Sequence, residues 1–167
     1  MNLMVSADGT LRIGAEQVRC ALGRSGIRDP KTEGDGATPA GCFALRRVLY
    51  RTDRIASPVT RLDTLPIGPQ DGWCDAPADP AYNRPVALPY PASTESLWRD
   101  DGLYDVVVVL DPPVAGRGSA VFMHVARPGY APTEGCVALA LADLLAVLRK
   151  CKPGDRICIS APDESRK

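Results

Sequence analysis

Two side chains of this sequence, the thiol of Cys136 and the imidazole of His124, are of the types that carry out nucleophilic catalysis. His124 is the only histidine, so any mechanism that moves a proton through an imidazole near neutral pH must use it. Cys136 follows 12 positions later, after a loop that two prolines stiffen and a glycine bends. The spacing therefore predicts a Cys–His pair in which the imidazole takes the thiol proton and the sulfur attacks a carbonyl carbon.

The residues around this pair predict a strand before the loop and a helix after it. Alternation over residues 120–125 places Phe122 and His124 on one face of a strand and the apolar residues between them on the other. Residues 136–150 carry leucines three and four positions apart, which is typical of an amphipathic helix. Cys136 would then open that helix, whose free N–H groups stabilise a thiolate and supply an oxyanion hole, while Gly135 lets the backbone approach the reacting carbonyl.

Each feature taken alone also fits a structural role. A histidine in a strand is often a packed polar residue, and a Gly-Cys pair before a helix is often a turn followed by a small core residue. The sequence shows no obvious carboxylate for a catalytic triad, but a backbone carbonyl that accepts the other ring N–H fixes the imidazole equally well. The combination of strand, loop and cysteine carries the catalytic interpretation.

The elements that must position the pair are mostly strands, arranged in one domain over residues 1–167. The pattern predicts an N-terminal hairpin as an edge element over about residues 1–24, one main helix, and a long excursion over residues 52–103 that is rich in proline and aromatic residues. Residues 104–110 contain four consecutive valines, which is typical of a strand buried on both faces. The remaining strands are predicted at residues 18–22, 42–50 and 156–160. The predicted fold is a mainly β sandwich or half-barrel.

Composition excludes several classes of function. The 20 basic residues balance 20 acidic ones, which argues against nucleic acid as a partner. No apolar stretch approaches the roughly 20 residues that a transmembrane helix needs. A single histidine and the absence of any C-x-x-C pair argue against a zinc site. The six cysteines match no small secreted scaffold, and Cys20, Cys151 and Cys158 are predicted to be small buried apolar residues.

Two segments give the chain a family resemblance. Residues 121–124 (VFMH) followed by 133–137 (TEGCV) resemble the signature of the L,D-transpeptidases, the YkuD-type catalytic domain, in which the histidine is the base and the cysteine the nucleophile. Residues 38–43 (TPAGCF) are similar to that family's Thr-Pro-x-Gly-x-Phe segment, and the resemblance runs from about Lys31 to Ile159. It implies a YkuD-like fold in which one main helix follows the catalytic cysteine.

The sequence departs from the family pattern at two positions. Glu134 replaces the second histidine of the usual Ser-His-Gly-Cys, and Ala138 replaces an arginine that commonly follows the cysteine by two positions. Arg127 and Glu134 are candidates to recognise the donor peptide in their place, although a solvated ion pair within the loop is an equally good interpretation. The other candidate substrate-binding residues are Tyr130, Asn83, Trp98 and Tyr104.

The resemblance implies a reaction on peptidoglycan stem peptides without a cofactor. Cys136 would form a thioester with an L-configured residue, backbone N–H groups of Gly135 and Cys136 would hold the oxyanion, and the Val125 carbonyl would orient His124. An amine from a second stem peptide then gives a cross-link, whereas water gives an L,D-carboxypeptidase or endopeptidase; a non-catalytic wall-binding module is the alternative from another class. Acylation by carbapenem-type β-lactams is expected. The resemblance points to the periplasm, yet residues 1–6 lack the features of a signal peptide, which leaves the cytoplasm as the alternative.

Overall fold

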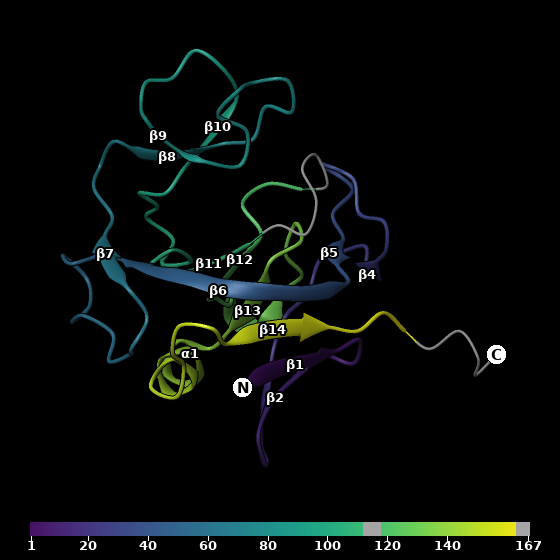
Figure 1. The fold of residues 1–167 in the computed structure, drawn as a ribbon. Coiled ribbons are helices and arrows are strands. Elements are labelled where there is room, and N and C mark those ends of the chain that lie inside the picture. Colours follow the sequence, from purple (N-terminus) through teal and green to yellow (C-terminus); the bar gives the residue numbers. More distant parts are fainter. Residues whose placement is uncertain (112–117, 163–167) are drawn as a thin grey trace.

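The structure is a computed structural model that describes residues 1–111 and 118–162 (Figure 1). Within these residues, nine strands form one large sheet, which the chain curls into a nearly closed barrel with a single α-helix against it. Eight of them follow in the order β13-β12-β11-β6-β14-β1-β2-β3, and β7 pairs with β6 beside this path. The mainly β architecture predicted from the sequence is therefore confirmed.

The strands of the large sheet have the following bounds: β1 (Asn2–Ser6), β2 (Thr10–Ile13), β3 (Glu16–Arg19), β6 (Gly41–Tyr50), β7 (Thr64–Pro66), β11 (Val106–Leu110), β12 (Phe122–Val125), β13 (Val137–Leu139) and β14 (Arg156–Ile159). The strands of the two smaller sheets are β4 (Ile27–Arg28), β5 (Thr38–Pro39), β8 (Asp71–Cys74), β9 (Pro85–Ala87) and β10 (Thr94–Ser96). The predicted strands at 42–50, 104–110, 120–125 and 156–160 agree with β6, β11, β12 and β14 to within two residues at each end.

The N-terminal hairpin β1–β2 forms as predicted, but the chain that follows it does more than cover an edge. After β3, Ala21 exchanges both backbone hydrogen bonds with Ala138, at 2.7 and 3.0 Å. Further on, the Arg24 N–H donates to the Thr133 carbonyl and the Thr133 N–H donates to Leu22. The first and last strands of the sheet are thereby joined, and the joint lies on the segment that leads to Cys136.

Strand β11 separates two apolar clusters, because its valines alternate between them. Val106 and Val108 pack into the main core inside the barrel, whereas Val107 and Val109 pack into a second cluster with Trp73. The same alternation continues in β12, where Met123 faces the main core; Phe122 faces the second cluster and His124 lies two positions further along. The predicted separation of faces in this strand is confirmed, and it turns the histidine away from the main core.

The predicted helix over 136–150 begins too early. Helix α1 spans Leu141–Leu148, and the preceding residues Val137–Leu139 form strand β13 instead. This short run is fully apolar, pairs in parallel with β12 and is bridged to Ala21 on its other side. A short run in which every residue is apolar cannot be separated from an adjoining helix by periodicity, because it fits a buried strand and a buried turn of helix equally well. Cys136 therefore precedes a strand and does not lie at a helix N-terminus.

Cys158 is buried as predicted, but it is not a free thiol. This residue forms a disulfide with Cys42, its direct partner across the antiparallel pair β6–β14. The two positions lie 116 residues apart in sequence, so no local spacing revealed them. Cys20 and Cys151 are buried free thiols, as predicted.

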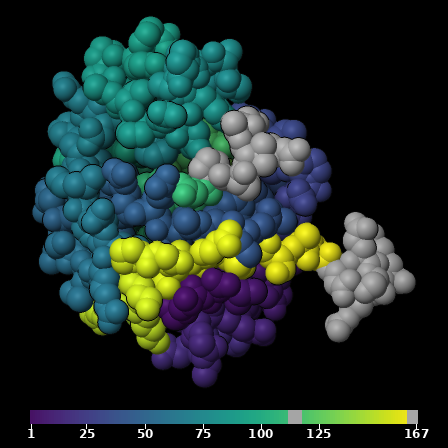
Figure 2. All heavy atoms as spheres, viewed as in Figure 1, coloured from purple at the N-terminus to yellow at the C-terminus, as the bar shows by residue number. Residues whose placement is uncertain are grey.

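The excursion over residues 52–103 contains a small sheet of its own. Strands β9, β8 and β10 pair antiparallel in that spatial order and stand away from the barrel (Figure 1). In the space-filling view this teal part of the chain forms the top of the molecule, above the blue band of β6 (Figure 2). In the described part of the chain, none of the helices has the length and apolar character needed to cross a membrane.

Candidate active site

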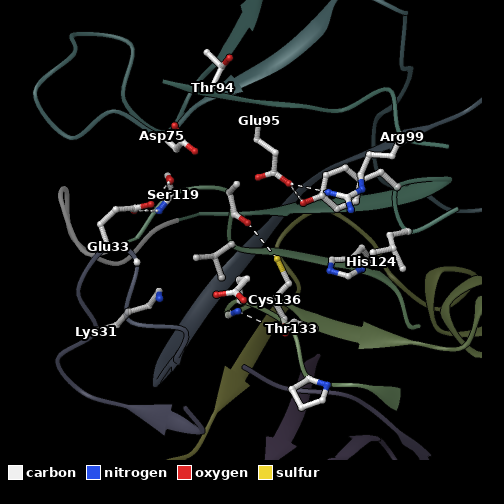
Figure 3. Close-up of a pocket in the computed structure, with 18 of the residues that line it drawn as sticks. Lys31, Glu33, Asp75, Thr94, Glu95, Arg99, Ser119, His124, Thr133 and Cys136 are labelled. Carbon is white, nitrogen blue, oxygen red and sulfur yellow. Dashed lines mark hydrogen bonds and ion pairs between the residues drawn. The ribbon is translucent and has the colours of Figure 1, made fainter. Parts of the chain in front are cut away.

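Cys136 and His124 line the same cavity, and two neighbouring strands bring them there. Parallel pairing of β12 with β13 sets His124 beside Ala138, so Cys136 lies next to Phe122, one step before the paired residues. The Phe122 N–H donates to Sγ at 3.4 Å, and the Sγ–H donates to the Ala120 carbonyl at 3.2 Å. Figure 3 shows the sulfur and the imidazole turned into one pocket.

The imidazole is held in one tautomer by the backbone. His124 Nδ1 lies 2.8 Å from the Val125 carbonyl oxygen, which can only accept, so Nδ1 carries the hydrogen and Nε2 remains unprotonated in the neutral ring. The ring is buried and packs edge-on against Tyr104, with centroids 5.3 Å apart. Nε2 is therefore the nitrogen available to act as a base.

Burial keeps both members of the pair neutral at rest. It lowers the pKa of His124 from 6.5 to about 4, although the hydrogen bond to Val125 opposes the shift. Burial also raises the pKa of the Cys136 thiol to about 12, with partial relief from the Phe122 N–H. A preformed thiolate–imidazolium pair is thus disfavoured, and the thiolate stabilisation expected from a helix start does not operate. An attack by this sulfur would therefore require the proton to leave during the same step.

The cavity above the pair has a volume of about 620 Å³ and mixed charge. Lys31 and Glu33 line one side, Asp75 and Glu95 the side formed by the small sheet, and Arg99 the end near His124 (Figure 3). Further lining residues are Gly34, Thr94, Leu103, Tyr104, Ser119, Ala120, Val121, Arg127, Pro132, Thr133, Glu134 and Gly135. Four carboxylates and three cationic side chains thus surround a space large enough for part of a peptide.

Glu33 joins three separate parts of the chain. One of its oxygens accepts hydrogen bonds from the Tyr82 hydroxyl at 2.6 Å and the Ser119 N–H at 2.8 Å, and the other accepts from the Ser119 hydroxyl at 3.0 Å. Tyr82 belongs to the excursion and Ser119 to the segment before β12. The carboxylate therefore fixes the small sheet against the strand that carries His124.

A second polar group lies beside the imidazole. Tyr104 donates its hydroxyl to Glu95, and burial raises the pKa of both residues. Arg99 lies over the Tyr104 ring with its guanidinium carbon 5.1 Å from the centroid, and it is paired with Asp101 at 2.6 Å. On the same wall as Glu95, Asp75 Oδ1 is buried with no hydrogen-bond partner in the described residues. This wall thus presents carboxylate oxygens toward any bound substrate.

The turn before Cys136 is held by its own residues. The Gly135 N–H donates to Thr133 Oγ1 at 3.1 Å, and this hydroxyl donates in turn to the Cys136 carbonyl at 2.6 Å. Gly135 has a φ of +143°, and a Cβ at this position would lie 2.7 Å from the Ala37 carbonyl oxygen. Only glycine fits this close contact between two backbone segments.

Two of the candidate substrate-binding residues on the His-to-Cys loop face the cavity. Arg127 and Glu134 both line it, but they do not pair with each other: Glu134 binds Arg24 at 3.1 Å. Tyr130 is not among the lining residues, and its ring instead faces the guanidinium of Arg19 at 4.3 Å. The interpretation of Arg127 and Glu134 as a loop ion pair is therefore wrong, and their role in binding substrate stays a prediction.

The candidates from the excursion are also divided. Tyr104 lines the cavity, whereas Trp98 lies outside it and stacks on the Arg51 guanidinium at 3.4 Å. Asn83 Oδ1 accepts hydrogen bonds from Trp73 Nε1 at 2.9 Å and from the Ala120 N–H at 3.0 Å. Asn83 thus supports the residue whose carbonyl holds the Cys136 thiol, and it does not reach the cavity.

Sequence reasoning missed most of the charged lining. Lys31 was noted only as the start of a resembling segment, and Glu33, Asp75, Glu95 and Arg99 were not named at all. The density of charged residues around Trp98 was the available signal, but without periodicity it could not indicate which side chains face inward. In the described part of the chain, no three His, Cys, Asp or Glu side chains converge as metal ligands.

Comparison with known proteins identifies the family of this site. The family model of YkuD, the L,D-transpeptidase catalytic domain, matches residues 2–159, which is nearly the whole chain. Searches of curated proteins and of solved structures found no match. The family match covers every element of the barrel and both members of the Cys–His pair. The chain therefore belongs to the YkuD family of L,D-transpeptidase catalytic domains.

Proposed function

We propose that this protein is a cysteine-dependent acyltransferase that cross-links peptidoglycan stem peptides. The observation that carries the proposal is the placement of Cys136 and His124 in one cavity, with Nε2 of the histidine left as a base. Family membership supplies the substrate class, because the matched domain is an L,D-transpeptidase catalytic domain. No cofactor takes part in the proposed reaction.

The proposed reaction has two halves that use the same imidazole. Cys136 Sγ attacks the carbonyl carbon of an L-configured stem residue while His124 Nε2 takes the thiol proton. When the tetrahedral intermediate collapses, the carbon–nitrogen bond breaks and His124 returns the proton to the departing amine, leaving a thioester. An acceptor amine then attacks the thioester, His124 takes its proton, and the new amide leaves as the thiol is restored.

The charge of the cavity supports an amine as acceptor. Asp75 and Glu95 lie on the wall formed by the small sheet, and Asp75 Oδ1 has no hydrogen-bond partner in the part of the chain described. Carboxylates in such a partly desolvated wall attract a protonated amine more strongly than they attract water. This raises the local concentration of the acceptor amine, which attacks the thioester once it has lost its extra proton, and so favours cross-linking over hydrolysis.

The disulfide supports a location outside the cytoplasm. Bridges such as Cys42–Cys158 persist in oxidising compartments and are rare in the reducing cytosol. Peptidoglycan, the proposed substrate, also lies outside the cytosol. We therefore propose the periplasm as the site of action.

The decisive experiment is mass spectrometry of muropeptides after incubation of the purified protein with isolated sacculi. We expect cross-linked products that contain a new amide to the L-configured residue, and none with Cys136→Ala. A tetrapeptide donor tested with and without an added amine separates transpeptidation from hydrolysis. If the only product is hydrolysed tripeptide, the enzyme is a carboxypeptidase and the proposed transferase is refuted.

Intact-mass analysis after carbapenem treatment provides an independent check. We expect one adduct on the wild-type protein and none on Cys136→Ala. A wild-type protein that forms no adduct and leaves sacculi unchanged, yet binds them, would be a wall-binding module and would refute the proposed enzyme.

A further inference from the structure

Two of the backbone donors expected for the oxyanion from the sequence, the N–H groups of a helix start and the N–H of Gly135, are not available in the structure, which leaves the Cys136 N–H. Helix α1 begins at Leu141, so its free N–H groups lie away from the nucleophile. The Gly135 N–H is already engaged with Thr133 Oγ1 at 3.1 Å. A carbonyl oxygen attacked by Cys136 acquires a full negative charge in a desolvated cavity, and such a charge requires preorganised donors. A second donor beside the Cys136 N–H would complete the stabilisation of this charge.

Lys31 brings a buried cation to this place. The residue is only 5% exposed, yet it lines the cavity, and Figure 3 shows its amine in the pocket that holds Cys136. Its Nζ lies 3.3 Å from the position that a Cβ on Gly135 would occupy. The ammonium group is therefore in contact with the peptide that leads directly into the nucleophile.

Two glycines make room for this side chain. A Cβ on Gly118 would lie 2.7 Å from Cε of Lys31, and one on Gly135 would press on its amine from the other side. Both glycines have positive φ angles, +110° and +143°. The lysine stem thus passes between two backbone segments without side chains, which is a costly arrangement for a residue that is usually exposed.

The ammonium group keeps donor capacity toward the cavity. One N–H binds Asp35 Oδ1 at 2.8 Å, and no second acceptor for Nζ is found in residues 1–111 and 118–162. A lysine ammonium has three N–H donors, so two remain. Although burial raises the pKa of Asp35, hydrogen bonds from Lys31 and from the Thr32 and Ala37 N–H groups hold it far below its ordinary value. Asp35 therefore stays ionised and fixes the lysine in place.

We propose that Lys31 is a catalytic residue that stabilises the oxyanion formed during attack by Cys136. As the carbon–sulfur bond forms, the π electron pair of the carbonyl moves to oxygen and an N–H of Lys31 donates to it without transferring its proton. As the carbonyl re-forms, the leaving group departs and the hydrogen bond weakens. The inference rests on acylation of Cys136 in the proposed function, and it requires no particular stem peptide.

The test compares two reactions of the same sulfur. Acylation by p-nitrophenyl acetate passes through a tetrahedral oxyanion, whereas alkylation by iodoacetamide displaces iodide and forms none. p-Nitrophenyl acetate is an ester without a free carboxylate, so a role of Lys31 in binding a substrate anion has no effect on its reaction. We measure both rates on wild type, Lys31→Met and the exposed-lysine control Lys152→Met, with intact mass to locate the adduct and Cys136→Ala as the blank.

Lys31→Met is expected to slow acylation roughly 100-fold, as loss of one oxyanion donor does in other enzymes, and to change alkylation less than about threefold. Lys152→Met is expected to change neither rate. An equal loss in both reactions would overturn the proposal and mark Lys31 as an activator of the thiol or a folding residue. Unchanged acylation, or a wild-type protein that is alkylated but never acylated, would overturn it as well.

Thermal denaturation accompanies each variant, since Lys31→Met leaves Asp35 without its partner. If that variant does not fold, the double variant Lys31→Met/Asp35→Asn removes both charges and is subject to the same two rate comparisons. Failure of the proposed function is distinguishable, because absence of cross-links in sacculi together with a selective acylation loss in Lys31→Met refutes the transpeptidase and supports the oxyanion role.

Discussion

Acidification from pH 7 to pH 5 is expected to destabilise the folded protein through His124. The ring is buried, and its pKa falls from 6.5 to about 4 on folding. Between these two values the unfolded chain binds a proton that the folded chain does not. Stability is therefore fully present above the unfolded pKa and is lost as the pH falls toward 4.

The size of the effect follows from the shift itself. Each pKa unit corresponds to about 1.36 kcal/mol, so the shift of His124 from 6.5 to about 4 is equivalent to about 3 kcal/mol in full. At pH 5 the unfolded imidazole is almost fully protonated and the folded one almost wholly neutral, which gives a loss of about 2 kcal/mol relative to pH 7.

Urea denaturation of wild type and His124→Gln at pH 7 and pH 5 measures this term. Glutamine carries no charge at either pH, so any constant cost of the substitution cancels when each protein is compared with itself. Other groups that titrate in this range, such as Glu95 with its raised pKa, contribute equally to both proteins. We expect wild type to lose about 2 kcal/mol more than the variant. The same pH dependence in both proteins would refute a buried neutral histidine at this site.

Three further substitutions test the supports of the site. Asn83→Ala leaves two donors, including the Ala120 N–H, without an acceptor, so urea denaturation should show a loss of about 2 to 4 kcal/mol and acylation of the nucleophile should slow; unchanged values would contradict its supporting role. Gly135→Ala places a methyl group 2.7 Å from a backbone oxygen, so mass spectrometry should detect no carbapenem adduct on the soluble variant, and a normal adduct would show that the turn yields. Replacing Cys42 and Cys158 by serine opens a loop of 116 residues, which should lower the free energy of unfolding by about 3 to 5 kcal/mol in urea. A serine variant as stable as the wild type would argue against the bridge.

The strands β6, β11, β12 and β14 could be predicted because each has a local signal. The valines of residues 106–109 and the alternation around His124 require only neighbouring residues to be interpreted, and both predictions are confirmed. The start of the helix could not be predicted, because Val137–Leu139 become a strand only through pairing with β12 and with Ala21, which lies far away in sequence. Tertiary contacts, and not the local sequence, therefore make residues 137–139 a strand.

The candidate site divides in the same way. Cys136 and His124 stand out by residue type and spacing, and the structure places them in one cavity. The disulfide, the Lys31–Asp35 pair and the position of Asn83 depend on contacts between segments that the chain order keeps apart or leaves without periodicity. Long irregular segments have no periodicity from which such contacts could be predicted. Sequence patterns therefore identify the reactive side chains but not the residues that surround them.

The small sheet β9–β8–β10 has a consequence for engineering. The proposed nucleophile and base are both carried by the barrel, while the opposite wall of the cavity comes from one continuous insertion between β7 and β11. Glu33 and the Asn83–Ala120 contact tie this insertion down at two points. Exchange of the insertion for another of similar span, with those two contacts kept, would give a chimera with the same Cys–His pair and a different cavity wall. The peptide preference of the chimera would then follow the inserted wall.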